Sequence, residues 1–71
     1  MLTILMFEDE KPADEYPYMA DEYIVITPTR CMAVGTSFVD RKELMENLVQ
    51  NIGGWVSWDV DEANGILVRT G

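Results

Sequence analysis

Residues 39–54, VDRKELMENLVQNIGG, constrain the fold more than any other stretch, because they have the pattern of one amphipathic helix. Their apolar residues recur at i, i+1, i+4, i+5 and i+8, which makes a single stripe along a helix: Leu44, Met45, Leu48, Val49 and Ile52. A helix this short is marginal on its own in water, so its stripe has to pack on another element. The rest of the chain is therefore expected to supply a sheet.

Both ends of this helix carry capping signals. Asp40 is the expected N-cap, because its carboxylate would accept hydrogen bonds from backbone N–H groups of the first turn. Glu43 lies three residues later and completes a pair like a capping box. Gly53 follows the last apolar residue and is expected to adopt the left-handed conformation that ends many helices.

Short apolar runs before the helix predict strands. Residues 1–7, MLTILMF, are apolar at nearly every position, which fits a strand buried on both faces in the interior of the sheet. Residues 23–27, YIVIT, and 31–34, CMAV, fit a hairpin around the turn 28–30. One longer, bulged edge strand that contains Pro28 is the alternative.

A second hairpin is predicted after the helix. Residues 55–60, WVSWDV, alternate so that Trp58 and Trp55 point to opposite faces of one strand, and residues 66–70, ILVRT, return after a loop that contains Asn64-Gly65. The sequence therefore predicts one small α+β domain over residues 1–71. We expect a mostly antiparallel sheet of four to five strands, with one helix packed on one face and the order β-β-β-α-β-β.

Residues 8–22, EDEKPADEYPYMADE, form an acidic segment between the first two predicted strands. Pro12, Pro17 and the repulsion between the acids predict a loop, and loops of this length in compact domains are usually functional or disordered. Seven of the 13 acidic residues of the chain lie here against one base, which places −6 of the net charge of −8 in this segment. Tyr16 and Tyr18 either fold back onto the core or form a contact patch, since Tyr is favoured at interfaces.

The composition argues against several classes of function. The chain has no histidine, which removes His-dependent triads, His metal sites and the commonest general base. Its single cysteine, Cys31, has no partner for an internal disulfide and lies in an apolar strand, so we expect an inert thiol and an intracellular, cytoplasmic setting. No apolar run is long enough to span a membrane, and the negative charge disfavours direct binding to nucleic acid or anionic membranes.

Residues 59–65, DVDEANG, look superficially like a calcium-binding loop. The spacing fails, because Ala63 occupies the fifth position, the glycine comes one residue late and Thr70 replaces the bidentate glutamate. A hairpin turn explains the same residues. With no phosphate-binding loop and no activated nucleophile, we expect a protein that is not an enzyme and that has no metal or cofactor.

Two functional hypotheses fit these features. The first is a small acidic interaction module that binds a basic surface of a partner protein, in its narrowest form an inhibitor or decoy that imitates DNA toward a nucleic-acid-handling protein. Small phage-encoded proteins offer an analogy of size and charge, and would place the chain in a host cytoplasm. The second is a structural or accessory subunit that homodimerises through its sheet, with the acids serving only solubility.

The partner-binding residues expected under the first hypothesis combine the charges of the acidic segment with nearby aromatic residues. Trp55 is included because tryptophan is a frequent interface anchor, although Tyr and Met side chains of the acidic segment would cover it in the alternative arrangement. The full set is Glu8, Asp9, Glu10, Asp14, Glu15, Tyr16, Tyr18, Asp21, Glu22 and Trp55.

Overall fold

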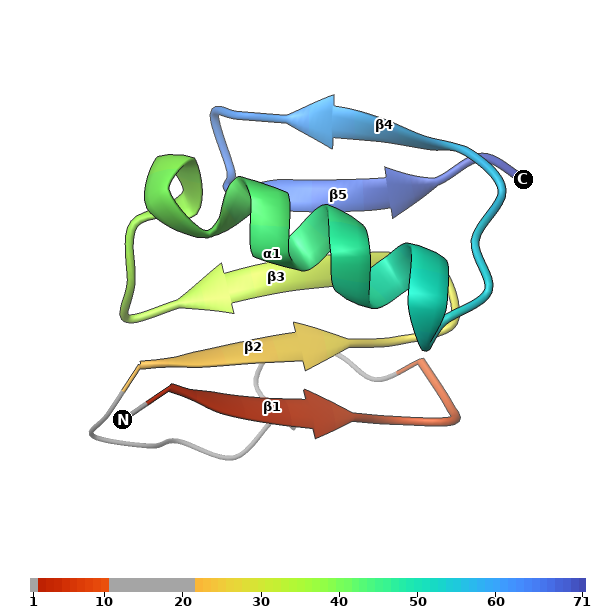
Figure 1. Cartoon of the computed structure of the whole chain (residues 1–71), viewed down its shortest axis with the longest axis horizontal. Helices are drawn as coiled ribbons and strands as arrows, with labels where there is room; N and C mark the ends of the chain where they lie inside the picture. The colour runs from red at the N-terminus through yellow and green to blue at the C-terminus, as the bar shows by residue number, and fades with distance from the viewer. Residues whose placement is uncertain (1, 11–21) are drawn as a thin grey trace.

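A computed structural model describes residues 2–10 and 22–71, and within them the chain forms five strands and one helix (Figure 1). The elements are, in chain order, β1 (Thr3–Met6), β2 (Tyr23–Ile26), β3 (Arg30–Val34), α1 (Phe38–Asn51), β4 (Trp58–Asp61) and β5 (Ile66–Arg69). The order β-β-β-α-β-β and the small α+β class are as predicted.

The five strands make one sheet in the spatial order β1-β2-β3-β5-β4. Three of the neighbouring pairs are antiparallel, including the two predicted hairpins, β2–β3 and β4–β5. The pair β1–β2 is parallel, with Thr3 opposite Tyr23 and Met6 opposite Ile26. The sheet is therefore mixed, because the chain between β1 and β2 returns to the end at which β1 began.

β1 lies at an edge of this sheet, so the prediction that it is an interior strand buried on both faces is wrong. Ile4 and Met6, which face the same side of the sheet as α1, keep 41% and 53% of their surface exposed. Figure 1 shows α1 running over β3 and β5, whereas β1 lies at the edge of the sheet on the far side of β2. An apolar run indicates a strand, but its position in the sheet is decided by long-range pairing that the run does not encode.

The core lies between α1 and the middle of the sheet. Met45 and Val49 of the helix are buried against a cluster that includes Ile24 and Cys31 from the sheet. Leu44 and Leu48 pack against the same cluster. The predicted stripe is thus confirmed except at its last member, because Ile52 is exposed.

The N-terminus of α1 is capped by Ser37 rather than by Asp40, which corrects the predicted cap. The Ser37 hydroxyl accepts a hydrogen bond from the Asp40 backbone N–H at 3.4 Å, and the helix begins at Phe38. Asp40 lies inside the first turn, where its charge favours the helix dipole without capping the helix. Both residues are good caps, and the chain starts the helix at the earlier one.

Ser37→Ala is expected to lower the free energy of unfolding by about 0.5–1 kcal/mol, because the Asp40 N–H loses its acceptor. Asp40→Asn removes only the dipole interaction and is expected to cost about 0.3 kcal/mol. Urea unfolding followed by circular dichroism compares the two variants. Because asparagine caps a helix as well as aspartate does, Asp40→Ala tests the alternative: a larger loss for Asp40→Ala than for Ser37→Ala would show that Asp40 is the working cap.

At the other end of the helix, the left-handed residue is Gly54, with φ of 69°, and not Gly53 as predicted. The Gly53 N–H donates to the Leu48 carbonyl at 3.2 Å, and the Trp55 N–H donates to the Val49 carbonyl at 2.9 Å. These bonds fold the chain back against the last turn of α1. They place the Trp55 side chain in the core.

The two tryptophans do not lie on opposite faces of one strand, which corrects the prediction for residues 55–60. β4 begins only at Trp58, and Val56, at 85% exposure, lies outside it. Trp55 is 3% exposed within the core cluster, and Trp58 packs against that same cluster. The alternation of residues 55–60 gave a wrong prediction because Trp55 does not belong to a strand. The turn after α1 determines where its side chain points.

The β4–β5 hairpin has the predicted position, but only one residue of its Asn64-Gly65 pair has a positive φ. Gly65 adopts φ of 68°, whereas no non-glycine residue of the described chain has a positive φ. Asn64 instead donates its side-chain amide to the Asp61 carboxylate at 2.9 Å. This bond joins two residues of the turn and so stabilises its conformation.

Candidate partner-binding surface

The acidic segment meets the described structure at its two ends. Glu8, Asp9 and Glu10 follow β1, and Glu22 precedes β2. The remaining predicted partner-binding residues of the segment lie outside the described residues: Asp14, Glu15, Tyr16, Tyr18 and Asp21. The described part of the candidate surface therefore consists of these two ends of the segment.

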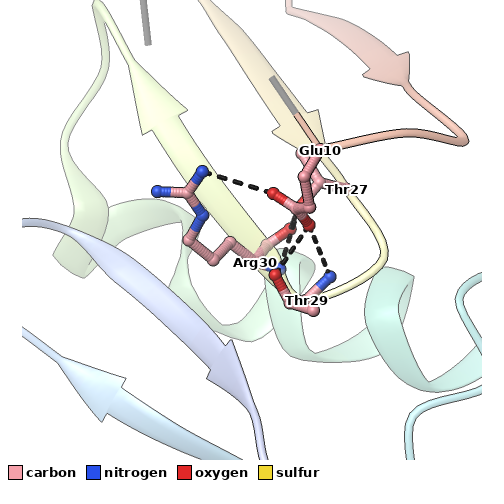
Figure 2. A network of polar contacts seen from close by, with 4 residues as sticks. All are labelled: Glu10, Thr27, Thr29 and Arg30. Atoms are coloured by element: carbon pink, nitrogen blue, oxygen red, sulfur yellow. Dashed lines mark hydrogen bonds and ion pairs between the residues drawn. The ribbon is translucent and has the colours of Figure 1, made fainter. Parts of the chain in front are cut away.

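Glu10 lies against the turn between β2 and β3 (Figure 2). One of its carboxylate oxygens accepts hydrogen bonds from the Thr29 backbone N–H at 2.9 Å and from the Thr29 hydroxyl at 2.6 Å. The other accepts from the Arg30 guanidinium at 3.3 Å. The Thr27 hydroxyl braces the turn by accepting from the Arg30 N–H at 2.9 Å. Glu10 thus serves as an anchor for the start of the acidic segment.

The environment of Glu10 holds its carboxyl group in the ionised form. Partial burial by itself raises the pKa of Glu10, but hydrogen bonds from Thr27, Thr29 and Arg30 outweigh it and lower the pKa from 4.5 to about 2. A carboxylate that already accepts three hydrogen bonds within its own chain has less to offer a basic partner than a free one.

Glu22 anchors the other end of the segment. Its carboxylate accepts from the Arg41 guanidinium of α1 at 3.0 Å, and Arg41 also donates to the Thr36 hydroxyl at 3.4 Å. A hydrogen bond from Thr36 and the charge of Arg41 both lower the pKa of Glu22. The connection between β1 and β2 is therefore tied to the first turn of α1 as well as to the β2–β3 turn.

These anchors were missed by reasoning from the sequence, which assigned Glu10 and Glu22 to partner binding. For Glu10, the usable signal was the Thr27–Arg30 stretch, TPTR, whose two hydroxyl groups and guanidinium are suitable donors for a carboxylate. The pattern identifies suitable donors, but it does not identify which of the 13 acidic residues accepts their hydrogen bonds.

Most of the other described acids keep their charge uncompensated. The two ion pairs among the described residues use Arg30 and Arg41, and Arg69 donates to the backbone carbonyls of Gly71 and Pro28 instead. Within residues 2–10 and 22–71, the acids that form no ion pair are Glu8, Asp9, Asp40, Glu43, Glu46, Asp59, Asp61 and Glu62. Glu8 and Asp9 are exposed beside the Glu10 anchor.

A second group of these acids lies on the β4–β5 hairpin. Asp59 is opposite Val68 and Asp61 is opposite Ile66, so both alternate with the core residue Leu67 and face away from α1. This group lies on the last strand of the sheet, at the edge opposite β1. With Asp40, Glu43 and Glu46 of α1, the acids that form no ion pair among the described residues lie in three separate parts of the fold.

Trp55 and Cys31 contribute to the core rather than to a surface. At 3% exposure, Trp55 presents almost no area to a partner in this fold. Cys31 is fully buried, and burial raises the pKa of its thiol to about 12. The predicted inertness of the thiol has its physical basis in this burial.

The described chain holds no group of three or more His, Cys, Asp or Glu side chains placed to bind a metal ion. Among the same residues, no helix has the length and apolar character needed to cross a membrane. No protein-family model, no curated protein and no solved structure matches this chain.

Proposed function

We propose that this protein is an acidic interaction module that binds a basic surface of a partner protein through residues 8–22. One observation carries the proposal: the segment that holds most of the net charge is fastened to the domain at both ends, by Glu10 and Glu22. Fastening reduces the conformational freedom that a charged segment loses when it binds. It favours a binding element over a charged stretch that serves only solubility.

The charges available to a partner are those of the segment that the domain does not use itself. Glu10 and Glu22 are satisfied within the chain, which leaves Glu8, Asp9, Asp14, Glu15 and Asp21. Their negative charge would steer encounter with a basic partner, and Tyr16 and Tyr18 would supply contact area. In its narrowest form, the partner is a nucleic-acid-handling protein whose DNA-binding surface this chain occupies.

The test compares two variants with the same net charge. The first changes Glu8, Asp9, Asp14, Glu15 and Asp21 to their amides and keeps both anchors, which moves the net charge from −8 to −3. The second makes the same five-charge change elsewhere, at Asp40, Glu43, Glu46, Asp59 and Glu62. Each variant is used to capture partners from a lysate across a salt series, and circular dichroism checks that both are folded.

A partner bound by the unchanged chain is expected to be lost with the first variant and retained with the second. Its binding is also expected to weaken as salt rises, and duplex DNA is expected to compete if the narrowest form is right. Equal capture by both variants, or equal loss, would contradict a specific role for residues 8–22. A partner that stays bound above about 0.5 M salt would show that charge is not the main source of affinity.

A further inference from the structure

β1 is an edge strand of the sheet, and its backbone bonds to β2 on one side. The Thr3 N–H donates to the Glu22 carbonyl and the Phe7 N–H donates to the Ile26 carbonyl, at 3.3 and 2.9 Å. In a parallel pair this alternation turns the backbone groups of Ile4 and Met6 away from β2. In the described part of the chain, no strand lies on that side of β1.

The same two residues are also partly exposed, at 41% for Ile4 and 53% for Met6. Ile4 and Met6 face the side of the sheet on which α1 lies, but neither belongs to the core cluster beneath the helix. An exposed, apolar edge strand with unpaired backbone groups is a template for a further strand. An occupant of this surface would have to supply both hydrogen-bonding backbone and apolar side chains.

The two edge strands of the sheet differ in charge, and charge affects whether an edge can pair with a second copy. β4 carries Asp59 and Asp61, and charged residues on an edge strand oppose pairing with another strand. β1, TILM, carries no charge in a chain whose net charge is −8. Two copies of this chain repel each other over most of their surface, but not where their β1 strands meet.

We propose that β1 pairs with β1 of a second copy of this chain, antiparallel, about a two-fold axis at Leu5. In this register Ile4 of one copy is opposite Met6 of the other, and the symmetry repeats the pair. The outward backbone groups of Ile4 and Met6 are the ones that an antiparallel pair of this kind hydrogen-bonds. The contact is isologous, so it closes at a dimer.

The pairing joins the two sheets into one continuous sheet with both helices on the same face. The exposed side chains of Ile4 and Met6 from both copies then form one apolar patch on that face, and the two Leu5 side chains meet on the other. A contact made mainly by one strand is small, so the dimer is expected to dissociate in the micromolar range, at about 10–100 µM. The proposal does not depend on what residues 8–22 bind.

The test is sedimentation of the whole chain between about 5 and about 500 µM, a range that brackets the expected dissociation constant. The mass is expected to rise with concentration from 8.1 kDa toward twice that value. Met6→Lys is expected to raise the dissociation constant at least about tenfold, because it places a charge on the pairing edge. Ile52→Lys adds the same charge at a residue of 54% exposure beyond α1 and is expected to change it less than about twofold.

Amide hydrogen exchange of the unchanged chain gives a second readout that needs no variant. The amides of Ile4 and Met6 are expected to exchange more slowly as concentration rises, whereas the Leu5 amide, directed toward β2, serves as the internal reference. A monomer at about 500 µM, a mass beyond that of a dimer, equal effects of Met6→Lys and Ile52→Lys, or concentration-independent exchange would each overturn the proposal.

Discussion

Trp55→Ala is expected to lower the free energy of unfolding by about 3–5 kcal/mol, the cost of removing a buried tryptophan. Trp55 is 3% exposed and lies in the cluster that joins α1 to the sheet. A chain of this length has a total stability of about 4–11 kcal/mol. The variant is therefore expected to lose a large fraction of its stability, and at the low end of this range it would be partly unfolded at 25 °C.

Urea unfolding followed by far-ultraviolet circular dichroism measures this loss, and Trp58 remains as a fluorescent reporter. Trp55→Phe retains part of the packing and is expected to lose less, which keeps the midpoint measurable. Val56→Ala, at the exposed neighbouring residue, is the matched control and is expected to lie within about 0.5 kcal/mol of the unchanged chain. Equal stability of Trp55→Ala and Val56→Ala would show that the indole does not lie in the core.

Glu10→Gln is expected to lower the free energy of unfolding by about 1 kcal/mol at pH 7, because the β2–β3 turn loses a charged acceptor. The loss is small for a charged acceptor because the Glu10 side chain is 37% exposed, and solvent screens its pair with Arg30. Glu8→Gln removes the same charge from an exposed residue with no ion pair among the described residues. It is expected to leave stability unchanged.

The Glu10 effect is expected to depend on pH in a defined direction. Its pKa is about 2 in the folded chain, below the ordinary value of 4.5, so the unfolded chain binds a proton first as pH falls. The stabilisation is therefore complete above about pH 4.5 and is lost progressively as pH falls through about 2. Unfolding curves between pH 7 and pH 2 should show the difference between the unchanged chain and Glu10→Gln shrinking toward zero. A difference that stays constant over this range would contradict the anchor.

Local patterns predicted the elements of this fold well, because each depends on neighbours in sequence. The stripe that contains Met45 and Val49 needs only helical periodicity, and the β2–β3 hairpin needs only a turn between two apolar runs. Ser37 shows the limit of local reasoning. It and Asp40 are both suitable caps, and their own residue types do not decide between them.

The parts that were not predicted depend on contacts between distant residues. β1 looked like an interior strand because residues 1–7 are apolar, but the sheet places β5 between β3 and β4 and leaves β1 outside. Trp55 was assigned to a surface because its strand was extended too far toward the helix. Among the site residues, Glu10 and Glu22 became anchors through partners 19 or 20 residues away, a separation that no short motif spans.

The parallel pairing of β1 with β2 decides which experiments on the acidic segment are informative. Parallel neighbours start at the same end of the sheet, so the chain after Met6 has to travel back by roughly the length of β1, about 13 Å, before β2 begins. A tight turn cannot make that connection. Shortening residues 8–22 to a hairpin loop would change the connectivity of the sheet together with its charge, and β1 would be forced to reverse or detach. The length of the segment is thus a requirement of the topology, whereas its charges other than those of Glu10 and Glu22 are not. Only substitutions that preserve the length separate the effect of charge from the effect of connectivity.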